Sequence, residues 1–240
     1  AELIASVRAW DRLRNRVVWL ALGELGLAYR DSRLKQSLTD TEVGGGRLWG
    51  PTGRWVVLDA TFAVRQGSLS SRIAYSQLAG ALGVELGERV PERELREAVL
   101  ELRRSKGMVL DGADHDTWSA GSFFINPILT TEQAEQLPEG APRFPVTDHS
   151  QVVLGTKAAP VIEGLVKTSA AWLIDHAGFS KGFAVEAGAP AGLSTKHVLA
   201  LTNRGGATGA DLARLRDAVV AGVRERYGVT LVPEPVQVGF

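Results

Sequence analysis

The chain has 240 residues, of which 45% are hydrophobic, so it is long enough for one large domain or two modest ones. Basic and acidic residues both number 27, and this zero net charge gives no electrostatic reason to expect nucleic acid or a membrane surface as a partner. The chain contains no cysteine, which excludes disulfides, thiolate metal sites and cysteine nucleophiles. No apolar stretch reaches the ~18 residues of a membrane span, and we expect a cytoplasmic protein.

The first block of elements runs from residue 1 to about residue 107. We expect strands at residues 3–10, 16–20 and 55–64, the last alternating and rich in valine and tryptophan. A plausible helix precedes the polar stretch at 28–32, and the three glycines at 44–46 indicate a loop insertion. Helices are expected at 75–82 and 91–104, the second opening with a proline.

The second block begins near residue 107 with a segment that leads to a strand around Ser122. A polar, proline-bearing connection at 132–149 follows, then a helix at 168–176, a strand at 196–202, and a long helix at 209–227. The tail at 229–240 is expected to be extended. Strands and helices interleave without a regular βαβ rhythm, and this order predicts an α+β fold.

The stretch at 121–127, Gly-Ser-Phe-Phe-Ile-Asn-Pro, places one small hydroxyl between a glycine and an apolar run. The two phenylalanines anchor the segment in a core, while the glycine allows close approach to the serine. This is how a site presents one reactive hydroxyl. The alternative, that Ser122 only caps a turn before a buried strand, is equally compatible with these seven residues.

Three charged residues are further candidates, each with a structural alternative. Arg30 could hold a carboxylate with two parallel hydrogen bonds, or it could be a surface residue paired with Asp31. Lys106 could contact a phosphate or carboxylate, or it could simply favour a helix C-terminus. Glu234 lies between two prolines, which suits a positioned acid or base but also an exposed tail.

Other features favour structural roles. The glycine-rich residues 203–211 lack the lysine and spacing of a P-loop, so we expect a turn with Thr208 as N-cap. The four histidines, His115, His149, His176 and His197, have no zinc-site spacing, and no metal is predicted. His176 is expected to be a partly buried core histidine, with a ligand contact as the alternative.

The order of several short motifs along the chain carries more information than any one of them. AYRDS at 28–32, IAYSQL at 73–78, the Lys106 helix end, GSFFINP at 121–127, SAAWLIDHAGF at 169–179, LSTKHVLALTNRGGAT at 193–208 and LVPEPV at 231–236 follow in succession. In this order the chain resembles the UDP-N-acetylenolpyruvoylglucosamine reductase (MurB) family, and the Phe-Phe pair with the following asparagine resembles its type I branch.

The resemblance implies a flavoenzyme of bacterial peptidoglycan synthesis. Members reduce the enolpyruvyl ether of UDP-N-acetylglucosamine to UDP-N-acetylmuramate, using NADPH and FAD. Matched by motif, Arg30 corresponds to the catalytic arginine, Ser122 to the proton donor and Glu234 to the catalytic glutamate. The same matching gives substrate-holding positions to Tyr75, Lys106, Asn126 and His176.

The chemistry of the residues agrees with these roles. Hydride addition to the vinyl carbon leaves negative charge delocalised into the carboxylate, which Arg30 and a protonated Glu234 can stabilise as hydrogen-bond donors. Ser122 then supplies a proton to carbon, which a serine does only in a dry site with a strongly basic partner. Lys106 and Asn126 would bind the diphosphate or carboxylate.

The resemblance also implies a domain organisation. Residues 1–107 would be the remainder of an FAD-binding (PCMH-type) domain, 108–228 the substrate-binding domain, and 229–240 a tail that returns to the active site. No glycine-rich grip for the FAD pyrophosphate precedes Ala1, so we expect the chain to lack the N-terminal part of the flavin domain. Two alternatives stay open: a catalytically silent fragment that at most binds a UDP-sugar, and a related flavin oxidoreductase with another substrate.

Overall fold

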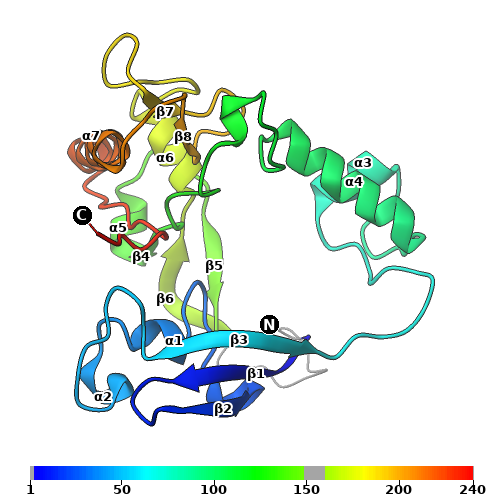
Figure 1. Cartoon of the computed structure of the whole chain (residues 1–240). Helices are drawn as coiled ribbons and strands as arrows, with labels where there is room; N and C mark the ends of the chain where they lie inside the picture. The colour runs from blue at the N-terminus through cyan, green and yellow to red at the C-terminus, as the bar shows by residue number, and fades with distance from the viewer. Residues whose placement is uncertain (1–2, 149–159, 240) are drawn as a thin grey trace.

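The computed structural model describes residues 3–148 and 160–239. Its elements fall into three groups along the chain, an N-terminal sheet, a pair of helices that stands apart as an arm, and a mixed C-terminal group (Figure 1). Helices and antiparallel strands alternate without parallel crossovers, which confirms the α+β class. No helix in the described part of the chain is long and apolar enough to cross a membrane.

The N-terminal sheet has the strand order β2-β1-β3, with β1 at Ile4–Asp11, β2 at Arg16–Ala21 and β3 at Trp55–Phe62. Alternate residues of β1 are buried because successive side chains point to opposite faces of a sheet. One face packs into a small core with Val7, Ala9, Leu20, Leu25 and Trp55. The three predicted strands are confirmed to within a few residues.

Between β2 and β3 the helical prediction is wrong. Only a 3₁₀ turn, η1 at Leu22–Glu24, precedes residue 28, and Gly26 then adopts a left-handed φ of 52° that a helix cannot continue. Two single-turn helices follow, α1 at Arg33–Gln36 and α2 at Thr41–Gly44. Gly44 ends α2 and Gly45 is its left-handed C-cap, so the triple glycine is a helix stop rather than a free loop insertion.

The helical arm consists of α3 at Ser76–Leu82 and α4 at Glu92–Ser105, each starting one residue after its predicted beginning. Tyr75 and Pro91 are the N-cap residues of these helices. The core of the arm is small and contains only Ile73, Ala79 and Val90 as buried residues. Figure 1 shows the arm reaching away from the other two groups.

The C-terminal group begins after the arm with the 3₁₀ turn η2 at His115–Thr117. A three-stranded antiparallel sheet has the order β4-β6-β5, and β7 pairs with β8. The remaining elements are β4 at Ile128–Thr130, α5 at Thr131–Glu135, β5 at Phe144–Thr147, β6 at Val161–Lys167, α6 at Ala170–His176, β7 at Ala191–Leu193, β8 at Leu201–Asn203 and α7 at Gly209–Tyr227.

Helix α7 is the longest element and anchors the main core. Thr208 caps its start through a capping box with Asp211, as the sequence predicts for Thr208, and Gly228 ends it in a left-handed conformation. Leu215, Val219 and Val223 recur every four residues, so they form one buried stripe. This stripe packs in the same core as Leu173 and Ile174 of α6.

Three predictions in this half need correction. The segment around Ser122 is not a regular strand but an extended stretch with one isolated bridge, between Phe124 and Pro233. The strand expected at 196–202 is confined to β8, because residues 194–200 fold into a turn closed by side-chain hydrogen bonds. The connection expected at 132–149 contains most of α5 and all of β5, and His149 lies outside the described residues.

Candidate functional site

Arg30, Ser122 and Glu234, which come from three distant segments, line one cleft of ≈ 820 Å³. Gly121 lies beside Ser122 with a left-handed φ of 79°, and no atom lies within 4 Å of where its side chain would be. The approach to the serine is therefore open, as the sequence predicts. The rest of the lining comes from the end of the arm and the following loop, with Arg103, Gly107, Met108, Leu110, Thr117, Ser119, Ala120 and, from the tail, Pro235.

Arg30 lies in a tight turn closed by reciprocal backbone hydrogen bonds between Ala28 and Asp31, of 3.0 and 3.3 Å. Its φ of 55° is left-handed, a conformation that costs a non-glycine residue about 1 to 3 kcal/mol and is concentrated at functional sites. Asp31 does not pair with Arg30, because its carboxylate accepts hydrogen bonds from Ser32 N and Gln36 Nε2. The surface-pair alternative for Arg30 is thus wrong.

Arg30 instead contacts Glu234, 204 positions away in the chain, with 2.9 Å between Nη1 and Oε1. Both side chains are partly exposed, at 49% and 33%, and such pairs contribute only about 0 to 1 kcal/mol to stability. The other guanidinium N–H groups of Arg30 have no hydrogen-bond partner among residues 3–148 and 160–239. The pair therefore leaves a planar set of donors directed at a polar cleft.

Glu234 reaches this position because the tail pairs with the segment that carries Ser122. Glu234 N donates to Phe123 O at 2.8 Å, and Ile125 N donates to Val232 O at 3.1 Å. Phe124, which is 2% exposed, anchors the paired segments in the core. The alternative of an exposed, unattached tail is wrong for Glu234, whose side chain lies against Arg30.

Ser122 Oγ lies 3.4 Å from Nε2 of His197. His197 is partly buried, and this burial, together with the positive charges of Lys106 and Lys181, lowers the pKa of His197 below its ordinary value of 6.5. The ring is consequently neutral at neutral pH. His197 lies within the motif at 193–208, but its spacing from the other histidines bears only on metal binding, so this contact with Ser122 is not predicted from the sequence.

Lys106 and Tyr75 line a neighbouring cavity of ≈ 310 Å³, which shares Arg103 and Met108 with the first. Lys106 is the C-cap residue of α4, and its Nζ donates to Gln77 Oε1 at 2.8 Å. Tyr75 is 75% exposed. These two predicted substrate positions therefore adjoin the cleft from the arm.

Asn126 and His176 do not line the cleft. Asn126 Oδ1 accepts a hydrogen bond from Ala170 N at 3.0 Å, so it holds the first turn of α6. His176 is exposed and stacks on Trp172, with ring centroids 3.9 Å apart, while its Nδ1 contacts Trp172 O. The interpretation of His176 as a core histidine is wrong, since the ring packs on the outside of the helix.

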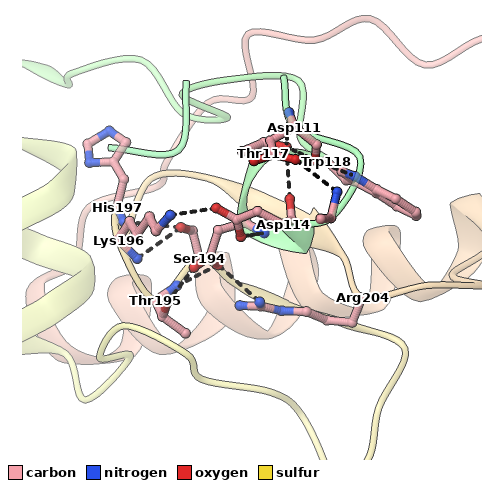
Figure 2. A network of polar contacts seen from close by, with 11 residues as sticks. Asp111, Asp114, Thr117, Trp118, Ser194, Thr195, Lys196, His197 and Arg204 are labelled. Atoms are coloured by element: carbon pink, nitrogen blue, oxygen red, sulfur yellow. Dashed lines mark hydrogen bonds and ion pairs between the residues drawn. The ribbon is translucent and has the colours of Figure 1, made fainter. Parts of the chain in front are cut away.

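A polar network on the far side of the His197 turn was also missed (Figure 2). Asp116 is buried and accepts hydrogen bonds from Thr195 N at 2.9 Å and from the Thr195 hydroxyl, while Arg204 Nη1 lies 3.0 Å from its Oδ1. Burial raises the pKa of Asp116, but the Thr195 hydrogen bonds and the Arg204 charge outweigh it and leave the pKa lowered. Asp114 pairs with Lys196 beside it.

Both glycine-rich stretches are closed by their own hydrogen bonds. Asn203 Oδ1 accepts from Gly205 N and Ala207 N, and the Asp211 carboxylate accepts from Thr208 N. The expected turn with Thr208 as N-cap is thus confirmed. Within the described residues, no group of three His, Cys, Asp or Glu side chains could hold a metal ion.

Comparisons with known proteins indicate the same family as the motifs do. Residues 113–238 match the family described as UDP-N-acetylenolpyruvoylglucosamine reductase, C-terminal domain. The reductase of that name from Cutibacterium acnes is 48% identical over 99% of this chain and 55% of its own length. The corresponding protein of Streptomyces coelicolor is 48% identical over 98% of this chain and 56% of its own length. The chain therefore spans about half the length of these curated relatives.

A solved structure of UDP-N-acetylenolpyruvylglucosamine reductase (MurB) from Thermus caldophilus aligns with 97% of this chain and 52% of its own, with a TM-score of 0.44 and 19% identity.

Proposed function

From the premise that the chain belongs to the UDP-N-acetylenolpyruvoylglucosamine reductase family, we propose that its cleft serves the reduction of UDP-N-acetylglucosamine enolpyruvate to UDP-N-acetylmuramate in peptidoglycan synthesis. The observation that carries the proposal is the convergence of Arg30, Ser122 and Glu234 on one cleft. These are the residues that the motifs single out, and they are 204 positions apart at the extremes.

The roles of the three residues follow from their chemistry. Arg30 binds the carboxylate of the enolpyruvyl group with its free N–H groups, and Glu234 in its protonated form donates a further hydrogen bond. These donors stabilise the negative charge that develops when the double bond is reduced. Ser122 gives its proton to the carbon next to the carboxylate, so an O–H bond breaks while the electron pair of the enolate forms the new C–H bond.

The cofactors belong to the proposal as well. FAD reduced by NADPH supplies the hydride in this family. Neither glycine-rich turn has the form of a pyrophosphate grip, because Gly44 N, Gly45 N and Gly46 N donate within their own turn and Gly205 N and Ala207 N donate to Asn203. We therefore assign no flavin contact to any residue described, and we propose residues 1–107 as part of a flavin domain, 108–228 as a substrate domain, 229–240 as the returning tail, and a cytoplasmic location.

Four residues are proposed to hold the substrate. Lys106 and Tyr75 adjoin the cleft through the neighbouring cavity, which supports contacts with the diphosphate or sugar. Asn126 uses its carbonyl oxygen to hold α6, so its amide group is the part left for substrate. His176 has the weakest support, because it does not line the cleft. Its role is proposed from the motif alone.

The test compares two serine-to-alanine variants in a flavin-loaded form, in which the chain is extended by the part of the relatives that it does not span. Ser122→Ala removes the proton donor, so substrate-dependent reoxidation of the flavin should slow by at least ~100-fold, while flavin reduction by NADPH is unchanged. The control, Ser68→Ala, removes an exposed hydroxyl outside the cleft and should stay within a few-fold of wild type. Stopped-flow reoxidation of Ser122→Ala at nearly the wild-type rate would exclude the proposed role.

A second candidate function is binding of a UDP-sugar without turnover. It is favoured by the 55% share of the C. acnes relative that the chain spans. A pure binding module binds UDP-N-acetylglucosamine in calorimetry but gives no substrate-dependent reoxidation in the flavin-loaded form, whereas the reductase gives both.

A further inference from the structure

The turn at residues 194–197 presents His197 to Ser122. Figure 2 shows that hydrogen bonds fix the conformation of this turn from two sides. From within, the buried Ser194 Oγ accepts hydrogen bonds from Lys196 N at 3.0 Å and His197 N at 3.2 Å. From outside, the Asp116 carboxylate holds Thr195, and Arg204 holds Asp116. A turn with so many internal hydrogen bonds has little freedom, so the fold fixes the backbone position from which His197 reaches Ser122.

The charged groups that face His197 favour its neutral form. Lys106 approaches from the end of α4, and Lys181 approaches from the loop after α6. Protonation of the ring would place a third positive charge near these two lysines, at a site where burial already disfavours a charged ring. A neutral ring carries one N–H, and when that hydrogen is on Nε2 it points to Ser122 Oγ at 3.4 Å. In this tautomer Ser122 is the acceptor, which leaves its own proton free for the cleft.

We propose that His197 is a positioning residue for proton donation by Ser122, and the inference rests on the proposed function. The Nε2–H hydrogen bond orients the serine hydroxyl and stabilises the negative charge left on Oγ after the proton moves to the substrate carbon. Water then returns a proton to Oγ, so His197 does not change its protonation state. Such a donor acts on charge that exists only late in the reaction, which is where a fixed hydrogen bond accelerates a reaction most.

The kinetic test uses His197→Gln and His197→Leu in the flavin-loaded form. Glutamine keeps a side-chain N–H donor, whereas leucine removes it. His197→Leu should slow single-turnover flavin reoxidation by ~100-fold or more, with His197→Gln recovering most of that loss. Protonated His197 still carries the Nε2–H donor, so the wild-type rate should not fall as the pH drops through the pKa of His197. A fall that His197→Gln lacks would mean that His197 acts as a base and would contradict the inference. Equal rates for wild type and His197→Leu would overturn the inference.

The Ser122→Ala background separates this inference from the proposed function. If both hold, adding His197→Leu to Ser122→Ala changes the rate little, because the two residues act as one unit. A slow Ser122→Ala with a fast His197→Leu leaves the proposed function standing and removes only the role of His197. A fast Ser122→Ala removes the proposed function itself.

A second measurement needs no flavin. Nitrogen-15 NMR of the 240-residue chain reports the tautomer of each histidine, and His197 should carry its hydrogen on Nε2 at neutral pH. Ser122→Ala should shift the Nε2 resonance of His197 and leave that of the exposed His176 unchanged. Lys181→Gln should raise the pKa of His197, because it removes one facing charge. A hydrogen on Nδ1, or an Nε2 resonance that does not respond to Ser122→Ala, contradicts the inference.

Discussion

Arg30 combines a backbone conformation that opposes stability with a side chain that contributes little to it. The left-handed φ of 55° is disfavoured for any residue with a Cβ atom, and the exposed pair with Glu234 offsets at most about 1 kcal/mol. Selection for stability alone would place glycine or asparagine here. The arginine is therefore best explained by what its guanidinium binds.

This interpretation predicts different tolerances for two conservative variants. Arg30→Lys keeps the charge but loses the planar pair of donors, so reoxidation of the flavin by substrate should slow by tens of fold or more. Glu234→Gln keeps a hydrogen-bond donor for the developing charge and should be less impaired than Glu234→Ala. Single-turnover reoxidation measures all three in the flavin-loaded form, with substrate binding followed separately by flavin perturbation. A wild-type rate for Arg30→Lys, or equal defects for the two Glu234 variants, contradicts the assigned roles.

Among the elements, β1 and β3 depend on one buried ion pair. Asp11 and Arg54 are joined by two hydrogen bonds, of 3.0 and 2.7 Å, and their side chains are 1% and 8% exposed. The pair closes the end of β1 against the start of β3, where Asp11 faces Trp55 in the register. Removal of Arg54 leaves the buried Asp11 carboxylate with two backbone N–H donors and the more distant Arg14 Nε, at 3.8 Å, in place of a buried charge partner.

Arg54→Met should therefore destabilise the N-terminal sheet by about 3 to 5 kcal/mol, measured by urea unfolding at neutral pH. The matched control is Arg96→Met, which breaks an exposed pair with Glu97 and should cost about 1 kcal/mol or less. A small effect for Arg54→Met would show that water reaches the Asp11 carboxylate and compensates for the lost interaction with Arg54.

The same pair makes a prediction about acid. Burial raises the pKa of Asp11, but the Arg54 hydrogen bond and the Arg14 and Leu13 N–H groups outweigh it and leave the pKa below 3.8. A lowered folded-state pKa contributes stability above the unfolded value, and this contribution is lost as the pH falls through the folded-state pKa. Wild type should thus lose more unfolding free energy below pH 3.8 than Arg54→Met does. Parallel losses in the two proteins would assign the acid sensitivity to other carboxylates.

At the scale of the whole molecule, the three groups of elements have very unequal cores. The hydrophobic core of the C-terminal group includes fully buried residues of α6, β7 and α7. The core of the arm contains only Ile73, Ala79 and Val90 as buried residues. Local stability follows buried apolar contact. Amide hydrogen exchange followed by mass spectrometry should therefore show α3 and α4 exchanging well before α7. Equal protection of the arm and α7 would mean that the arm is stabilised by contacts beyond its own core.

A second whole-molecule prediction concerns flavin. Because the glycine-rich turns at 44–46 and 203–209 are closed by their own hydrogen bonds, the purified chain should carry little or no flavin. The measurement is the visible absorbance spectrum, with added FAD as a titration. A stoichiometric flavin spectrum would show that the described residues bind the cofactor in a way their backbone does not indicate.

Local sequence patterns predicted the long helices and strands well. For the site, they predicted which residues take part but not how those residues contact one another. The period of α7, its Thr208 cap and the alternation of β1 are properties of neighbouring residues, so the sequence contains them. The false helix before residue 28 and the misplaced strand at 196–202 fail where glycine conformation and side-chain hydrogen bonds override apolar pattern. The contact of Ser122 with His197 depends on tertiary structure, and no spacing along the chain encodes it.

The small core of the arm has a consequence for affinity. Tyr75 and Lys106 lie on the arm, whereas Ser122 and Glu234 lie on the large C-terminal core. A ligand that touches both sides must hold the arm in one position, so ordering the arm offsets part of its binding free energy. Its apparent dissociation constant equals the intrinsic constant divided by the fraction of molecules whose arm is already in that position. By thermodynamic linkage, such a ligand should slow amide hydrogen exchange in α4 far more than in α7. Exchange in the arm would therefore report whether the ligand is bound.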